Sequence, residues 1–215
     1  MHLGALGVLG PHLLVAHAVW IDEDERDALL ATGTAVASCP WAYLRLGQGV
    51  TAAGRHHELI ERGGRVALGT DAANAGDLPD VLRTAALAAG LARDMTADPQ
   101  RMGADTAFAL ATIGGAEAIG LGARIGSLEP GKAADIVVHD GRSLSWTPPG
   151  DPALHLVWGT DGRTVRHVVV DGRVVVRDGR CTTVDVDELR AMVIDAKARL
   201  LDRAGIVVPS RWNRR

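Results

Sequence analysis

The stretch VALGTDAAN, residues 66–74, is an apolar run that ends abruptly on Gly-Thr-Asp. It is typical of a short buried strand between two helical segments. In parallel α/β sheets, functional side chains gather at the carboxyl ends of strands, where a charged group need not enter the core. Asp71 has that position, which indicates a functional carboxylate. A turn or helix-capping role would suit an aspartate equally well.

Two earlier runs have the same character. LLVAHAV (13–19) and TAVASCP (34–40) are short and apolar, as strands buried on both faces are. His17 lies near the end of the first run, and Cys39 near the end of the second. Three parallel strands would therefore deliver an imidazole, a thiol and a carboxylate to one rim, a combination suited to a metal-assisted hydrolase. The alternative for His17 is a core histidine with satisfied hydrogen bonds.

Helical segments separate and follow these strands. Residues 22–33 have an acidic start and a glycine stop, and 55–64 also end on glycine. Alanine-rich segments at 78–94 and 104–120 predict two more helices. The β-α-β-α-β-α order is that of parallel α/β folds.

The pattern changes after residue 120. Residues 121–183 contain short β-branched runs, and Asp171-Gly172 predicts a two-residue hairpin turn within a small antiparallel unit. Residues 184–215 hold an amphipathic helix and a tail. We therefore expect three parts, 1–120, 121–183 and 184–215.

Composition and charge exclude several classes of protein. The net charge of −3 and the absence of a basic stripe argue against a nucleic-acid partner. The apolar N-terminus has no basic n-region or cleavage site, so neither a signal peptide nor a membrane span is expected. Cys39 and Cys181 form no C-x-x-C, which argues against a zinc finger or a disulfide framework and indicates a cytoplasmic location.

A second Gly-Thr-Asp occurs at residues 159–161. Here Asp161-Gly162 leads directly into the β-branched run TVRHVVV. Asp71, by contrast, lies between the VAL strand and a helix, so we interpret Asp161 as a structural turn residue.

Taken together, LLVAHAVWID, CPWAYLRLGQG, ERGGRVALGTD and GSLEPGKAADIVV resemble the C-terminal half of the amidohydrolase superfamily. The nearest branch is the chlorohydrolase and aminohydrolase group, with guanine, cytosine and S-adenosylhomocysteine/methylthioadenosine deaminases. The resemblance implies an α/β fold, namely strands six to eight of a TIM-like (β/α)8 hydrolase barrel. GSLEPGKAADIVV is the most specific piece, because in the family it belongs to a small β-sandwich beside the barrel.

The resemblance also implies roles for two residues. His17 would be the active-site imidazole that contacts the hydrolytic water or the substrate. Asp71 would be a metal ligand that also accepts a proton from the attacking water. The implied cofactor is a divalent metal, zinc first and iron as the alternative. The implied reaction is deamination of a small heterocyclic substrate, at a carbon–nitrogen bond that is not a peptide bond.

The chain departs from its relatives around this rim. Relatives commonly carry Cys-Pro-x-x-Asn-Leu-Lys-Leu-Gly, whereas this chain has Trp41 and Tyr43 and lacks the Asn. Trp20 stands where many relatives have a second histidine, and Asn74 follows Asp71 where a serine is common. Trp20, Trp41 and Asn74 are therefore candidate substrate contacts, with packing as the alternative for the tryptophans.

The family's His-x-His and His-x-x-Glu motifs are absent from the sequence. His56-His57 is the only close pair, and adjacent helical side chains diverge by about 100°, so they are unsuited to sharing one ion. A catalytic zinc normally takes three or more protein ligands, so the remaining ligands must lie elsewhere. We expect a truncated product or, alternatively, a split enzyme completed by an N-terminal fragment, with a homo-oligomer also open. The isolated chain should be weakly active or inactive.

Two other classes remain open. In a doubly wound binding module, GLGARIG (120–126) would have to bind a nucleotide, but its glycines have the wrong spacing for that motif. In a non-catalytic subunit, the β unit and the terminal helix would dock a partner. Stoichiometric metal in the completed protein would separate an enzyme from either class.

Overall fold

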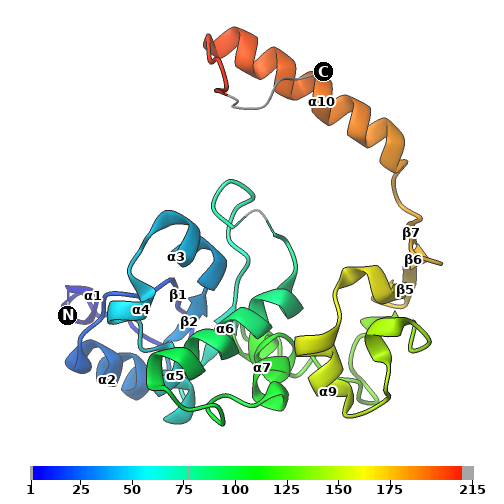
Figure 1. Cartoon of the computed structure of the whole chain (residues 1–215). Helices are drawn as coiled ribbons and strands as arrows, with labels where there is room; N and C mark the ends of the chain where they lie inside the picture. Colours follow the sequence, from blue (N-terminus) through cyan, green and yellow to red (C-terminus); the bar gives the residue numbers. More distant parts are fainter. Residues whose placement is uncertain (1, 77, 210–215) are drawn as a thin grey trace.

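The computed structural model describes residues 2–76 and 78–209. A helical body surrounds a three-stranded parallel sheet, and a four-stranded antiparallel sheet follows it in the chain (Figure 1). The predicted α/β class is confirmed. Residues 210–215, the end of the expected tail, lie outside the described residues.

The parallel sheet consists of the three strands expected from the sequence. These are β1 (Leu14–Ala16), β2 (Ala35–Ser38) and β3 (Val66–Leu68), in the order β1-β2-β3. Val15 pairs with Val36, which pairs in turn with Val66. Because all three strands run in the same direction, their carboxyl ends share one edge. Within residues 2–76 and 78–209 the sheet does not close into a barrel.

Among the described residues up to 120 there are eight helices. They are α1 (His2–Ala5), α2 (Glu23–Thr32), α3 (Pro40–Leu46), α4 (Val50–Ala53), α5 (His56–Glu61), α6 (Val81–Thr96), α7 (Ala104–Leu110) and α8 (Ile113–Ala118). Helix α2 begins with a capping box, in which Asp22 and Glu25 each accept the other's backbone N–H. It ends at Gly33, whose φ of 66° is left-handed, as its sequence predicts.

Two helical regions differ from the prediction. No helix was predicted between residues 41 and 54, but α3 and α4 lie there; α3 begins at Pro40, whose φ is suited to the first turn of a helix. The single helix expected at 104–120 is instead α7 and α8. Thr112 interrupts it with φ −129° and ψ −100°, while its hydroxyl donates to the Phe108 carbonyl.

The core lies between the parallel sheet and the helices that cover it. One cluster joins β2 and β3 to α2, α5 and α7: Leu29, Val36, Leu59, Val66 and Leu110. A second is made mainly of alanines on α6 and α7: Ala85, Ala86, Ala89, Ala104, Ala107 and Val157. These apolar contacts hold the body together and leave the carboxyl edge of the sheet for polar groups.

The antiparallel sheet has the order β4-β5-β6-β7. Its strands are β4 (Ile136–His139), β5 (Val165–Val170), β6 (Arg173–Arg177) and β7 (Arg180–Cys181), and between β4 and β5 lie η1 (Leu144–Trp146), α9 (Pro152–Leu154), η2 (His155–Gly159) and η3 (Gly162–Thr164). Asp171 (φ 47°) and Gly172 (φ 76°) connect β5 to β6, which confirms the predicted two-residue turn.

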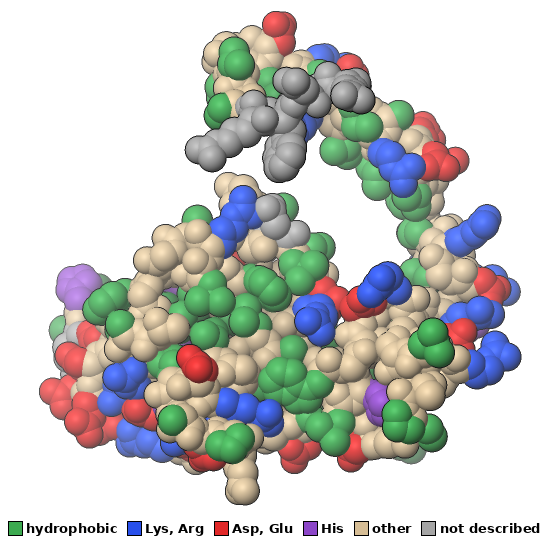
Figure 2. Space-filling view, in the orientation of Figure 1, with side chains coloured by type: hydrophobic (Ala, Val, Ile, Leu, Met, Phe, Trp, Pro, Cys, Tyr) green, Lys and Arg blue, Asp and Glu red, His purple; other side chains and the backbone are tan. Residues whose placement is uncertain are grey.

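Helix α10 (Val186–Ala204) lies apart from both sheets (Figure 1). None of its residues is buried, and none of the residues of β4–β7 is buried either. Figure 2 shows hydrophobic side chains among charged ones on the α10 surface. These elements therefore have no fully buried core within the described chain. No helix among the described residues combines the length and the hydropathy needed to cross a membrane.

Candidate functional site

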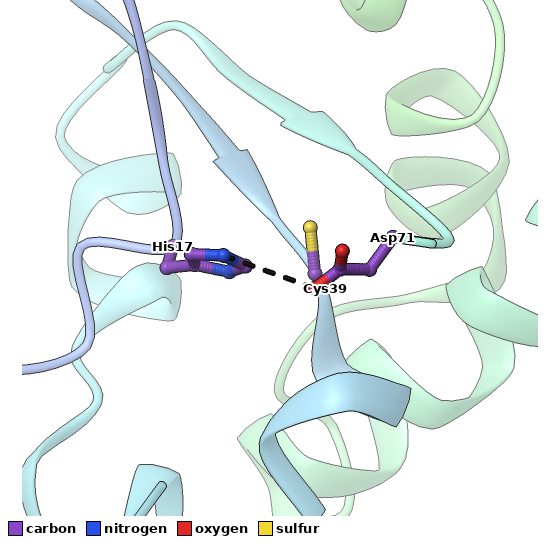
Figure 3. A group of neighbouring side chains, drawn as sticks. All are labelled: His17, Cys39 and Asp71. Carbon is purple, nitrogen blue, oxygen red and sulfur yellow. Dashed lines mark ion pairs between the residues drawn. The ribbon is translucent and has the colours of Figure 1, made fainter. Parts of the chain in front are cut away.

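The carboxyl edge of the parallel sheet brings His17, Cys39 and Asp71 together (Figure 3). One ligand atom from each residue lies within 4.8 Å of the other two. His17 Nε2 is 3.8 Å from Asp71 Oδ2, an ion-pair distance if the imidazole is protonated. Within residues 2–76 and 78–209 this is the only such group of three metal-ligating side chains. The convergence expected from the three strand ends is confirmed.

Both His17 and Asp71 have left-handed backbone. The His17 N–H donates to the Ala37 carbonyl over 2.9 Å, which extends the ladder one residue beyond β1. The chain then turns with φ 72° at His17 and 50° at Ala18, and Asp71 has φ 60°. Such values are uncommon for residues other than glycine and gather at functional sites. Asp71 Oδ1 also accepts the Ala72 N–H over 2.6 Å, which fixes the orientation of the carboxylate.

Gly69 makes room for the Cys39 thiol. Its N–H donates to the Ser38 carbonyl over 2.8 Å, and a Cβ at this position would lie 2.9 Å from Cys39 Sγ. The glycine of Gly-Thr-Asp is therefore required by close approach. Cys39 is buried, and burial together with the negative charge of Asp71 raises the pKa of its thiol to about 11.

Tyr43 and His56 lie behind this group. The Tyr43 hydroxyl donates to the His17 carbonyl over 3.2 Å and accepts the Cys39 N–H over 2.6 Å. His56 Nε2 lies 2.6 Å from the same His17 carbonyl oxygen. The Tyr43 ring stacks on His56 and meets His17 edge-on, with centroids 5.5 Å and 5.7 Å apart. Burial raises the pKa of Tyr43 to about 12 and lowers the pKa of His56.

Sequence reasoning missed these two contacts. It noted Tyr43 only as a departure from the relatives and considered His56 only as half of an adjacent histidine pair. In the structure the two imidazoles have different partners. His56 contacts the His17 carbonyl, whereas the buried His57 has its Nε2 3.9 Å from Glu58 Oε1. The contacts to His17 cross between elements far apart in the chain, so no local pattern signals them.

The three candidate substrate contacts have different surroundings. Trp20 is 72% exposed, its indole N–H donates to the Gln48 carbonyl over 2.8 Å, and its ring lies against Gly49. Trp41 is partly buried, and its buried indole nitrogen has no hydrogen-bond partner among the described residues. Asn74 is exposed, in the turn that follows Asp71.

The second Gly-Thr-Asp behaves as predicted. Asp161 caps η3 by accepting the Arg163 N–H over 2.9 Å, and its carboxylate also accepts from the Arg163 guanidinium. These hydrogen bonds lower the pKa of Asp161 to about 2. Asp161 is therefore a turn residue whose carboxylate pairs with the Arg163 guanidinium.

The donor set at the sheet edge fits a divalent metal. Imidazole nitrogen and carboxylate oxygen bind zinc in proteins, and cysteine sulfur does so once its proton has been lost. In addition, His17 Nδ1 is buried without a hydrogen-bond partner among the described residues. An unpartnered buried nitrogen is uncommon unless a bound group completes it.

Comparison with known proteins gives the family. The profile of the amidohydrolase family matches residues 2–175. The chain belongs to the amidohydrolase family. A 5-methylthioadenosine/S-adenosylhomocysteine deaminase of Syntrophobacter fumaroxidans is 38% identical over 192 residues, covering 89% of this chain and 43% of the relative. A 5'-deoxyadenosine deaminase of Methanothermobacter thermautotrophicus is 34% identical over 199 residues, covering 93% and 45%.

Solved structures agree with this membership. A zinc-bound adenosine deaminase from Xanthomonas campestris superimposes with a TM-score of 0.86 at 28% identity, covering 92% of this chain and 44% of that one. A zinc complex of atrazine chlorohydrolase from Arthrobacter aurescens gives 0.81 at 28% identity, covering 90% and 42%. This amidohydrolase chain spans less than half the length of the curated relatives it matches.

Proposed function

We propose that this chain forms the C-terminal part of a metal-dependent deaminase that acts on a heterocyclic, nucleoside-like substrate. The observation that carries the proposal is the convergence of His17 and Asp71, 3.8 Å apart, at the carboxyl edge of a parallel sheet in an amidohydrolase. Relatives named as deaminases of methylthioadenosine and deoxyadenosine support the substrate class.

In this proposal the two side chains have different roles. Asp71 would hold the metal and accept a proton from the attacking water. His17 would orient that water or donate a hydrogen bond to the substrate as ammonia leaves. A bound divalent metal supplies Lewis acidity that makes water nucleophilic near neutral pH. Zinc is the first candidate, since zinc-bound structures are among the neighbours, and iron is the alternative.

Trp20, Trp41 and Asn74 are proposed to contact the substrate. The exposed indole ring of Trp20 offers a stacking surface for a flat heterocycle. The unpartnered N–H of Trp41 offers a donor, because a buried indole nitrogen usually has an acceptor. Asn74 supplies an exposed amide beside the metal-ligand candidate. Packing against the protein remains the alternative for both tryptophans.

We further propose that β1–β3 are the last strands of an eight-stranded barrel, within a barrel part of residues 1–120. Residues 121–183 would be part of a small β-sandwich, and 184–215 a terminal helix and tail. The unburied surfaces of β4–β7 and α10 support this arrangement, since a sandwich needs a second layer. The missing strands and metal ligands would come from a longer form of the chain or from a separate polypeptide. We propose a cytoplasmic location, because Cys39 and Cys181 are free thiols and the cytoplasm keeps thiols reduced.

A non-catalytic subunit is the second candidate, and the unburied α10 is the observation that favours it. Metal content separates the two candidates. An enzyme completed by its missing part should bind stoichiometric divalent metal, whereas a docking subunit should bind none.

The test begins with the DNA upstream of the Met1 codon, which should encode His-x-His and His-x-x-Glu in frame or in a neighbouring gene. The chain is then produced with that region, loaded with zinc, and assayed for ammonia release from 5'-methylthioadenosine and 5'-deoxyadenosine. We expect release by the combined protein and little or none by the chain alone. Absence of both ammonia release and stoichiometric metal from the combined protein would overturn the proposal.

A further inference from the structure

We infer that Tyr43 and His56 are positioning residues that clamp the His17 carbonyl and thereby aim the His17 imidazole at Asp71. This inference rests on the proposed function for its catalytic meaning, but its geometric content can be tested without any reaction. Neither Tyr43 nor His56 is proposed as a metal ligand or a substrate contact; both act through His17.

The first step is the double contact to one oxygen. The His17 carbonyl accepts from the Tyr43 hydroxyl over 3.2 Å and from His56 Nε2 over 2.6 Å. A carbonyl oxygen has two lone pairs, so these donors satisfy it fully. Because a carbonyl can only accept, the proton of a neutral His56 must be on Nε2.

The second step concerns the backbone at the clamp. His17 has φ 72° and Ala18 has φ 50°, a left-handed pair that is unfavourable for residues other than glycine without compensation. The His17 carbonyl belongs to the same turn that places the His17 Cα and Cβ, so holding this carbonyl also holds the point from which the side chain projects. Two donors on that oxygen, in partly buried surroundings, therefore hold the conformation in which Nε2 faces Asp71 Oδ2.

The third step is the link to the neighbouring strand. Tyr43 Oη also accepts the Cys39 N–H over 2.6 Å, so one hydroxyl ties the end of β2 to the turn after β1. Tyr43 is buried, and its ring stacks on His56 at an interplanar angle of 12°.

Four variants of the whole chain test the clamp. Tyr43→Phe removes one donor and keeps the ring. His56→Val removes the other donor, whereas His56→Gln keeps an N–H that can reach the carbonyl. His57→Gln is the matched control, because this neighbouring buried imidazole faces Glu58 and not His17.

The first readout is the nitrogen-15 NMR signal of the His17 ring in the metal-free chain, assigned by its loss in His17→Gln. We expect the His17 signals to move in Tyr43→Phe and His56→Val, to return towards wild type in His56→Gln, and to stay unchanged in His57→Gln. The inference is overturned if Tyr43→Phe and His56→Val leave them in place, or if His57→Gln moves them as far.

The second readout is kinetic and uses the combined, zinc-loaded protein. Supporting residues around metal sites typically contribute about 10–100-fold to activity. We expect kcat to fall about tenfold in Tyr43→Phe and His56→Val with KM within about twofold, and His56→Gln to recover most of kcat. If the protein proves not to be a deaminase, only this second readout is lost and the NMR result still decides the clamp. Unchanged kcat in an active enzyme overturns the inference and leaves the proposed function intact.

Discussion

His17 Nε2 lies 3.8 Å from Asp71 Oδ2, although β2 and several helices separate the two residues in the chain. The approach follows from parallel strands that all end at one edge of the sheet. Cys39, at the end of the strand between them, completes the group. The site is therefore a consequence of topology.

The two Gly-Thr-Asp sequences provide a matched pair for metal binding. In the combined protein, Asp71→Asn should lower zinc affinity at least about tenfold and reduce ammonia release by about a hundredfold or more, because a neutral amide is a poor zinc ligand and proton acceptor. Asp161→Asn should leave both unchanged, since Asp161 is engaged by Arg163. Competition with a chromophoric chelator measures the affinity. Equal effects of the two substitutions would contradict the assignment of Asp71.

Arg65 should be a major contributor to the stability of the body. Its guanidinium donates to the carbonyls of Pro11, Gly33 and Glu117 at 2.7–2.8 Å, which joins the segments before β1 and β2 to helix α8. We expect Arg65→Ala to lower the free energy of unfolding by about 2–4 kcal/mol, because several charge-assisted hydrogen bonds are lost.

Arg62→Ala is the control for that substitution. Arg62 forms a surface ion pair with Asp27, and such pairs contribute about 0–1 kcal/mol. Urea unfolding followed by circular dichroism measures both variants. Similar losses for Arg62→Ala and Arg65→Ala would show that the carbonyl contacts of Arg65 add nothing.

The contact between Gly69 and Cys39 predicts a non-additive pair. Gly69→Ala should destabilise the chain by about 1–3 kcal/mol, because its Cβ would lie 2.9 Å from Cys39 Sγ. In a Cys39→Ala background the same change should cost much less, and a double-mutant cycle measures the difference. Gly90→Ala, a helical site with no atom within 4 Å of the added carbon, should instead stabilise by about 0.5–1 kcal/mol. Strict additivity at 39 and 69 would refute the steric explanation.

His57 should make stability depend on pH. Burial, and then the nearby Arg101 cation, lower the pKa of His57, while Glu58 and Glu61 oppose this shift. The unfolded chain, with a histidine pKa of about 6.5, therefore binds the proton first. The stability due to neutral His57 is fully present above about pH 6.5 and is lost as pH falls from there through the folded-state pKa.

Urea unfolding at about pH 7.5 and about pH 5.5 checks this dependence. The wild-type chain should lose more free energy of unfolding between the two values than His57→Gln does. His56, whose pKa is also lowered, is present in both proteins, so the difference reports on His57. An equal loss in both proteins would assign the pH dependence to other groups.

Much of the fold could be predicted because its signals are local. The apolar runs that carry His17, Cys39 and Asp71 at or near their ends contain β1, β2 and β3, and Asp171-Gly172 forms the hairpin turn. Each signal acts over a few residues, through side-chain periodicity or backbone preference. Helix α3 and the break at Thr112 were missed, because helix boundaries depend on neighbours as well as on propensity.

The sequence alone determined which residues end the parallel strands, and hence that an imidazole and a carboxylate would share one rim. Only the tertiary structure decided how that rim is held. Tyr43 and His56 contact the His17 carbonyl from helices α3 and α5, and Gly69 leaves room for the Cys39 thiol. Both sets of contacts depend on how the elements pack in three dimensions. Periodicity specifies the face on which a side chain lies, whereas a hydrogen bond between distant elements requires both backbones to be in place.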